Sequence, residues 1–268
     1  MERPSWAPDE IDLDRPSAAR MYDSFLGGSH NFAPDRAAAR AAIGIIPELP
    51  AVMRANRAFL RRAVRYAASL GIRQFLDLGS GIPTVGNVHE VARAADPDAR
   101  VVYVDVDPVA VAHSRALLAG DDQTAVVEAD VRDPGTLLAD DTLHATLDLG
   151  RPVALLMVAL LHFVPDGDDP AGLVRRYADA LAPGSVLAVS HGTGDGRTEQ
   201  SDRMVRLYAG TANPLTARTR AGVAALFDGF ELVDPGVVFL PLWRPDSPAD
   251  VPDRPERFCS YAGVGRKP

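Results

Sequence analysis

Short apolar runs of strand length alternate with amphipathic stretches along most of this chain. Apolar runs at 74–78, 101–106, 125–129, 153–161 and 186–189 predict strands, and the stretches at 87–95, 108–119 and 170–182 predict helices between them. Strands that are apolar on both faces and separated by helices are typical of a parallel sheet covered on both sides. The pattern therefore predicts an α/β fold with five parallel strands.

The pattern changes after the fifth predicted strand. Helical stretches at 197–209 and 219–227 are followed by extended runs near 230–242 and 257–266, with a proline-rich stretch, 243–256, between these runs. A proline-rich connection favours an antiparallel return of the second run beside the first. The complete prediction is a Rossmann-like, seven-stranded, mostly parallel sheet with an antiparallel edge strand.

The first fifty residues have a different pattern. Residues 1–16 predict a loose arm, residues 17–26 a short helix that Ser17 caps and Gly27-Gly28 ends, and a second short helix begins at Asp35. We therefore divide the chain into an N-terminal arm and helical cap, 1–50, and a ligand-binding domain, 51–268.

A longer amphipathic helix is predicted at 51–70. Its apolar face carries Met53, Leu60, Val64 and Ala67, and its other face carries an arginine stripe, Arg54, Arg57, Arg61 and Arg65. A solvated face is the favoured interpretation of this stripe, and an anion site or a partner site is the alternative.

Composition narrows the class of protein. The chain has 268 residues and a net charge of −8, which argues against a nucleic-acid partner because phosphate binding requires a basic surface. Cys259 is the only cysteine, so a multi-cysteine zinc site is excluded, and no histidine spacing suggests another metal site. The longest apolar run is too short to span a bilayer. We expect a cytoplasmic protein without a membrane partner, whose oligomeric state stays open.

The segment FLDLGSGIPT carries the densest functional signal. Asp77 lies near the end of the first predicted strand, and Gly79, Ser80 and Gly81 form the turn after it, where ligands of open α/β sheets bind. A dinucleotide site requires a third glycine, and Thr84 stands at that position. An acidic residue before the turn opposes a diphosphate and suits an ammonium group. S-adenosylmethionine has an ammonium and a sulfonium and no phosphate, so it is the predicted cofactor.

The ends of the next two strands add to this site. Asp105 lies 24 positions after Gly81 and is the predicted ligand of both ribose hydroxyls, with Val106 beside it. Asp107 precedes a proline and is instead predicted to cap the following helix. After the third strand, Asp130 would accept from the adenine amino group and the Val131 amide would donate to a ring nitrogen.

These residues resemble the class I S-adenosylmethionine-dependent methyltransferases. Together with PSAARMYDSFLGGSHNFAPDR, NRAFLRRAVR, NVHEVA, ALLHFV and FELVDPGVV, they also resemble a bacterial, actinobacterial-type S-adenosyl methyltransferase family that was formerly a domain of unknown function. The resemblance extends over about 17–267. It implies the fold, the cofactor and the roles of the strand-end residues, and it implies no acceptor. The Pro83-Thr84 pair departs from the superfamily pattern and leaves the contacts after Gly81 open.

The sequence offers fewer candidates for catalytic residues than for cofactor-binding residues. His162 and His191 follow the fourth and fifth strands and would serve as a base or an orienting group, or only as residues of strand-end turns. In the N-terminal cap, Tyr22 and Asn31 are predicted to lie nearest the ligand when the cap closes over it, whereas Tyr22 could also simply anchor the cap.

The function predicted from the sequence is transfer of a methyl group from S-adenosylmethionine to an unidentified small-molecule acceptor. A binding module that senses the cofactor without turnover is the main alternative. A nicotinamide oxidoreductase is disfavoured by the missing glycine and by Asp77, and a pure interaction domain leaves the strand-end aspartates unexplained.

Overall fold

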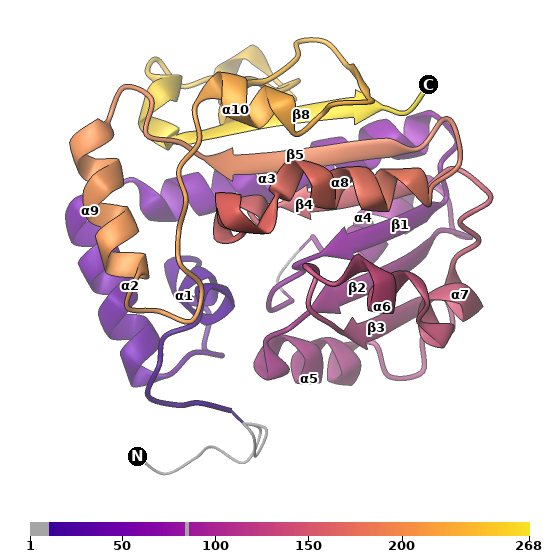
Figure 1. The fold of residues 1–268 in the computed structure, drawn as a ribbon, viewed down its shortest axis with the longest axis horizontal. Coiled ribbons are helices and arrows are strands. Elements are labelled where there is room, and N and C mark those ends of the chain that lie inside the picture. The colour runs from indigo at the N-terminus through magenta and orange to yellow at the C-terminus, as the bar shows by residue number, and fades with distance from the viewer. Residues whose placement is uncertain (1–10, 84–85) are drawn as a thin grey trace.

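One mixed sheet with helices on both faces forms the body of the protein (Figure 1). The computed structural model describes residues 11–83 and 86–268. The sheet order is β3-β2-β1-β4-β5-β8-β6, and β7 also pairs with β8. The first five strands are parallel, and β8 is antiparallel to β5. The strands are β1 (Gln74–Leu78), β2 (Arg100–Asp105), β3 (Thr124–Glu128), β4 (Ala154–Val158), β5 (Val186–Gly192), β6 (Glu231–Leu232), β7 (Val238–Phe239) and β8 (Ser260–Arg266).

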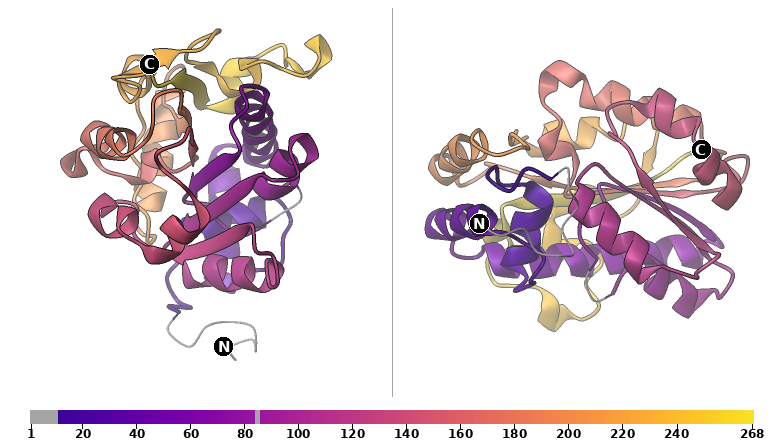
Figure 2. Two further views of the ribbon diagram at one scale, coloured as in Figure 1. Left: turned by 90° about the vertical axis from the view of Figure 1, so that its right-hand side faces the viewer. Right: turned by 90° about the horizontal axis from the view of Figure 1, so that it is seen from below.

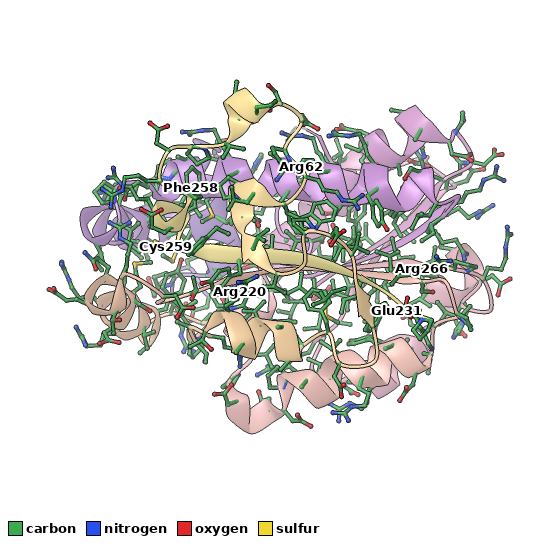
Figure 3. All side chains as sticks on the ribbon, turned by 90° about the horizontal axis from the view of Figure 1, so that it is seen from above. Arg62, Arg220, Glu231, Phe258, Cys259 and Arg266 are labelled. Carbon is green, nitrogen blue, oxygen red and sulfur yellow. The ribbon has the colours of Figure 1, made fainter. Side chains whose placement is uncertain are left out.

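The predicted α/β class and the mostly parallel sheet are confirmed, but the strand count is eight and not seven. The apolar run at 230–242 divides into β6 and β7, because a turn through Pro235 and Gly236 interrupts it, with Gly236 at φ 77°. Both short strands pair with β8, which lies between β5 and β6 and is therefore not the outermost strand. Figure 3 shows β8 from above, with Glu231 of β6 close to Arg266 at the end of β8.

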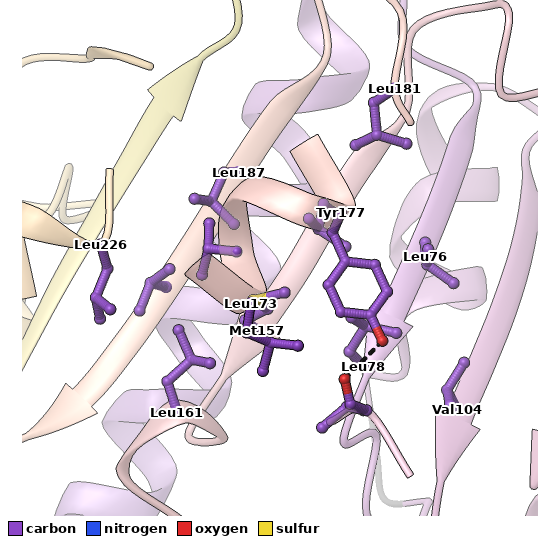
Figure 4. Close-up of a cluster of buried hydrophobic side chains, with 14 of the residues drawn as sticks. Leu76, Leu78, Val104, Met157, Leu161, Leu173, Tyr177, Leu181, Leu187 and Leu226 are labelled. Carbon is purple, nitrogen blue, oxygen red and sulfur yellow. Dashed lines mark hydrogen bonds between the residues drawn. The ribbon is translucent and has the colours of Figure 1, made fainter. Parts of the chain in front are cut away.

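The central strands are buried because two layers of helices cover them (Figure 2). One face packs against α6 (Pro134–Leu138), α7 (Asp141–Thr146), α8 (Pro170–Asp179) and α10 (Arg220–Ala225), and the other against α3 (Leu49–Ser69), α4 (Val88–Ala95) and the end of α5 (Pro108–Leu117). Leu173 and Tyr177 of α8 lie over Leu76, Met157 and Leu187 of the sheet (Figure 4). This two-sided burial explains why the strands are apolar throughout.

Local capping sets several helix starts. Asp107 is the N-cap of α5, and its carboxylate accepts the Val109 N–H at 2.9 Å, which confirms the predicted cap. The helices α6 and α7 were not predicted, although Asp133 and Asp140 cap them in the same way. Each has no more than six residues, too few to show a helical period.

The fourth predicted strand ends earlier than its apolar run. β4 stops at Val158, because Ala159 adopts φ 57°, and a 3-10 turn, η1 (Leu161–Phe163), follows. His162 therefore lies on a turn beyond the strand. Further 3-10 turns are η2 (Asp166–Asp168), η3 (Leu240–Leu242), η4 (Pro248–Asp250) and η5 (Pro255–Phe258).

The N-terminal helices lie beyond the carboxyl ends of the parallel strands (Figure 1). α1 (Ala18–Phe25) and α2 (Ala33–Ile45) pack against the start of α3 and against α9 (Thr198–Tyr208) through an apolar cluster that includes Met21, Phe25, Leu49 and Tyr208. Ser17 is at the N-cap position of α1, but its hydroxyl makes no cap bond and donates to Asp107 instead. Within the described ranges, no helix is long and apolar enough to cross a membrane.

Candidate active site

A cavity of about 510 Å³ opens at the carboxyl ends of β1, β2, β3 and β4, beneath α1. Its volume is in the range of small-molecule and cofactor sites. The described residues that line this main cavity include every predicted cofactor-binding residue except Asn31, namely Tyr22, Asp77, Gly79, Ser80, Gly81, Asp105, Val106, Asp130 and Val131. Parallel topology brings these separate strand ends to one edge.

The glycine turn after β1 brings backbone to the cavity wall. Gly79 and Gly81 both have φ 67°, a conformation that favours glycine. The Gly79 and Ser80 amides donate to the Val104 carbonyl at 2.8 and 3.0 Å, which holds the turn against β2. A Cβ on Gly79 would lie 2.6 Å from the Leu160 side chain, whereas Gly81 has open space beside it. The turn is thus fixed in place and leaves room for a ligand at Gly81.

Asp105 connects the glycine turn to the end of β2. One of its carboxylate oxygens accepts the Gly81 N–H at 2.7 Å, and the other accepts the Asp107 N–H at 2.8 Å. Burial raises the pKa of Asp105 to about 6, although these two N–H donors act in the opposite direction. Each carboxylate oxygen has a second lone pair. The group can therefore accept two hydroxyl donors from the cavity while it keeps its backbone contacts.

Asp77 is a buried carboxylate to which no described residue donates a hydrogen bond. It is 5% exposed and lines the main cavity. Burial is the main cause that raises its pKa to about 7; the nearby Arg57 cation opposes this rise, and the Asp105 carboxylate adds to it. A buried acid without donors is costly when ionised. A cationic ligand group is the partner that this carboxylate lacks.

Arg57 lies on the same cavity, although the sequence singled it out only as one member of the arginine stripe. Its Nη2 donates to the Gly86 carbonyl at 3.2 Å, while its Nε is buried and has no partner among the described residues. The solvated-face interpretation of the arginine stripe holds for Arg54, which is exposed, and is wrong for Arg57. The four arginines share one helical spacing, so only the packing of α3 against the loop before α4 distinguishes them.

The ends of β2 and β3 form a flatter wall. Val106 is 55% exposed although it is apolar, and it lines the main cavity. The Val131 carbonyl accepts the Tyr177 hydroxyl at 2.8 Å (Figure 4), and no described group accepts the Val131 amide. Asp130 is already engaged by Arg132, whose Nη2 donates to it at 2.5 Å, and this contact lowers the pKa of Asp130.

Of the two predicted cap residues, Tyr22 lines the main cavity together with several other residues of the cap, and Asn31 does not. The Tyr22 hydroxyl donates to the Met53 carbonyl at 3.1 Å and accepts from the Asn56 amide at 3.0 Å. The Asn31 amide donates to Asp23 at 2.7 Å and to the Gly28 carbonyl at 2.9 Å, so it fastens the turn between α1 and α2.

A second cavity of about 70 Å³, the inner chamber, lies between α1, α3, η1 and the end of β5. It is lined by Phe25, Met53, Ser190, Tyr208, Ser260 and others, and by both candidate histidines. His162 Nδ1 accepts the Gly192 N–H at 3.3 Å. His191 Nδ1 donates to the Gly192 carbonyl at 2.7 Å, and its Nε2 accepts from Arg218 at 2.8 Å. Neither histidine lines the main cavity.

Metal ligation has no support in the described part of the chain, where no group of three or more His, Cys, Asp or Glu side chains could hold an ion. The main cavity combines the Asp77 carboxylate, to which no described residue donates, the Arg57 guanidinium, the Asp105 carboxylate and an apolar wall.

Comparison with known proteins agrees with this geometry. The sequence profile described as S-adenosyl methyltransferase matches residues 4–268. The chain belongs to this S-adenosyl methyltransferase family. No curated protein matches it. The same family was formerly called DUF574. A DUF574 family protein from Streptomyces avermitilis is 44% identical to this chain, with a TM-score of 0.92. The match covers 97% of this chain and 100% of that one.

Two further structures extend the comparison. A Thermobifida fusca protein described as a candidate methyltransferase is 45% identical over 98% of this chain and 99% of its own, with a TM-score of 0.91. TnmH is 19% identical with a TM-score of 0.52, over 87% of this chain and 61% of its own, and shows a shared fold alone. The family and the fold predicted from the sequence are confirmed.

Proposed function

We propose that this S-adenosyl methyltransferase family member transfers the methyl group of S-adenosylmethionine to a small-molecule acceptor. The observation that carries the proposal is the pair of Asp77 and Arg57, two groups of opposite charge on one cavity wall that no direct ion pair joins. The amino-acid end of the cofactor has an ammonium and a carboxylate, which match these two groups.

The rest of the cavity supports the same ligand. The Asp105 carboxylate lines the cavity, and its oxygens would accept the two ribose hydroxyls beside their backbone contacts. The exposed Val106 side chain offers an apolar face to adenine, and the Val131 amide offers a donor to a ring nitrogen. Asp130 would accept from the adenine amino group beside its contact with Arg132. When bound, the cofactor supplies a methyl group on a cationic sulfonium.

Tyr22 and the cap would close the cavity over the ligand and exclude water. On this proposal residues 1–50 are the cap of a binding domain at 51–268, and the acceptor is small because it must enter beneath that cap. The net charge of −8 makes a nucleic-acid acceptor unfavourable.

Calorimetric titration tests the cofactor directly. S-adenosylmethionine and S-adenosylhomocysteine should bind, and NAD should not. Tighter binding of NAD than of either would overturn the proposal. Formation of S-adenosylhomocysteine with small molecules from a host extract separates a methyltransferase from the alternative, a binding module without turnover.

A further inference from the structure

The inner chamber borders the main cavity at the end of β4. Five residues line both spaces, namely Ala18, Tyr22, Asn56, Ala159 and Phe163. A cofactor in the main cavity and a second molecule in the chamber would therefore meet along this shared wall. The chamber volume of about 70 Å³ admits the reacting end of a small molecule, while the remainder would extend into the larger space.

The chamber contains no charged side chain. None of its described lining residues is Asp, Glu, Lys or Arg. Burial lowers the pKa of His191 to about 4 and that of His162 well below its usual value, and burial raises the pKa of Tyr22 and of Tyr208. All four side chains are therefore neutral near pH 7. A carboxylate would enter this chamber without a counter-charge, which is unfavourable.

Charge behind the chamber wall is already compensated. Arg218 contacts His191 from outside, and its guanidinium donates to Asp166 at 2.5 Å and to the carbonyls of Leu161 and Val164 at 2.8 Å. This ion pair therefore leaves no net charge to attract an anion.

In each of the two histidines, the ring nitrogen that carries the lone pair already accepts a hydrogen bond. The Gly192 N–H points at His162 Nδ1, so the neutral ring of His162 carries its proton on Nε2. His191 donates from Nδ1 to a carbonyl, and its Nε2 lone pair is occupied by an Arg218 N–H. No described histidine of the chamber therefore offers a free basic nitrogen.

Other polar groups of the wall are engaged in the same way. Ser190 donates to the Asn56 side-chain oxygen at 2.5 Å and accepts the Ala159 N–H at 2.9 Å, and the Asn56 amide donates to Tyr22. This chain of hydrogen bonds ends at the Met53 carbonyl, which Tyr22 donates to. These hydrogen bonds hold the shared wall in place. The hydroxyl groups in the chain, those of Ser190 and Tyr22, are too weakly basic to deprotonate an acceptor.

We propose that the inner chamber binds the methyl acceptor and selects an uncharged nitrogen base, whose lone pair is free before it enters. This inference rests on the proposed function. The nitrogen lone pair forms a bond to the methyl carbon, the carbon–sulfur bond breaks with its electron pair passing to sulfur, and the positive charge moves from sulfur to nitrogen. No proton has to leave during the step. The aromatic faces of Tyr22, Phe25 and Phe163 stabilise the cationic product by cation–π interaction.

Pyridine, phenol and benzoate are suitable probes because they are similar in size and differ in charge and in the need for a base. The full chain is first titrated with S-adenosylhomocysteine, and its complex is then crystallised and soaked with each probe. With S-adenosylmethionine, products are identified by mass spectrometry. We expect pyridine in the inner chamber and N-methylpyridinium as the product, with no anisole or methyl benzoate.

Two variants test the chamber itself. Ser260 and Gly192 line the chamber and not the main cavity. Ser260→Leu fills it, and Gly192→Ala is a milder change, because a Cβ there would lie 4.0 Å from the His162 ring. Both should lower methylation of pyridine, Ser260→Leu by at least tenfold, and leave S-adenosylhomocysteine affinity within twofold. The matched control is Ser69→Leu, an exposed position that should change neither quantity.

The outcomes separate the two proposals. Failure of S-adenosylhomocysteine to bind would overturn the proposed function. If it binds, then absence of pyridine from the chamber, absence of N-methylpyridinium, or methylation of phenol or benzoate in its place would overturn only the inference about the acceptor. If Ser260→Leu and Gly192→Ala both fold and both methylate pyridine at an unchanged rate, the inference about the acceptor is likewise overturned.

Discussion

Asp77 and Arg57 are the residues in which burial has the clearest functional consequence. A carboxylate without donors and a guanidinium Nε without an acceptor are both unfavourable inside a protein. An ammonium group bound in the cavity would be the partner that Asp77 lacks, and a carboxylate on the same ligand would lie close to the Arg57 cation. This interpretation makes the binding of the amino-acid end depend on the ionisation of Asp77 and on the Arg57 cation, while Asp105, with its pKa raised to about 6, titrates at lower pH.

The first prediction concerns pH. Because the pKa of Asp77 is raised to about 7, the free protein must lose a proton there before it can bind an ammonium group. Affinity for S-adenosylhomocysteine should therefore rise with pH, by up to about tenfold per unit below pH 7. Calorimetry from pH 5.5 to 8 measures this dependence. Asp77→Asn should bind more weakly at pH 8 and match the wild type near pH 5.5. Parallel pH curves for the two proteins would contradict the assignment.

The second prediction concerns Arg57. A hydrogen bond to a charged group contributes about 1.5–3 kcal/mol, so Arg57→Leu should weaken S-adenosylhomocysteine binding by about tenfold or more. Methylthioadenosine has no carboxylate, and its affinity should be unchanged. Arg54→Leu, on an exposed part of the same helix, is the control. Equal losses for both ligands would place Arg57 away from the amino-acid end.

At the scale of elements, Asp107 joins the cap to the carboxyl edge of the sheet, where the main cavity lies. This side chain caps α5 and also accepts from the Ser17 hydroxyl at 2.5 Å, while Arg20 lies 3.7 Å from it. Asp105 lies two positions earlier and faces the cavity. The start of α1 is therefore fixed close to the predicted ribose site.

The third prediction follows from this connection. Asp107→Ala should lower the free energy of unfolding by about 1–2 kcal/mol through loss of the helix cap, and should speed amide exchange over 18–25 because Ser17 loses its acceptor. Its effect on cofactor affinity should be much smaller than that of Asp105→Ala. Asp133→Ala removes the cap of α6 and is the control, since it should destabilise the fold without changing exchange in α1. A larger affinity loss for Asp107→Ala than for Asp105→Ala would show that the ribose ligand is misassigned.

At the scale of the whole molecule, the main cavity has walls from both the cap and the sheet. A ligand that contacts both should make them unfold together. At about one hundred times its dissociation constant, a ligand adds about 2.7 kcal/mol to the free energy of unfolding.

The fourth prediction is the thermal consequence. Saturating S-adenosylhomocysteine should raise the melting temperature by about 5 °C or more, and should slow amide exchange over 20–32 as well as at the strand ends. NAD at the same concentration should have neither effect. If the melting temperature rises while exchange in the cap ignores the ligand, the cap is a structural arm and Tyr22 is not part of the site.

Local patterns were sufficient for much of this protein. The five parallel strands, the glycine turn, the cap at Asp107 and the set of strand-end residues follow from apolar runs, glycines and aspartates close together in the chain. Such signals can be read because strand burial and helix capping depend on neighbouring residues. The division of 230–242 into two strands depends on pairing with β8, which no local pattern contains.

Only the tertiary structure decided the contacts between segments that are distant in the chain. Arg57 and Arg54 have the same local spacing, yet packing against Gly86 places one on the cavity and leaves the other exposed. Asn31 is polar and near glycines, as a ligand residue would be, yet Asp23 takes its amide. The tautomers of His162 and His191 depend on one backbone unit of β5 and on Arg218. The sequence determined which chemical groups reach the binding edge, and long-range packing determined which of them face the ligand, because side-chain direction and hydrogen-bond partners are set by residues far apart in the chain.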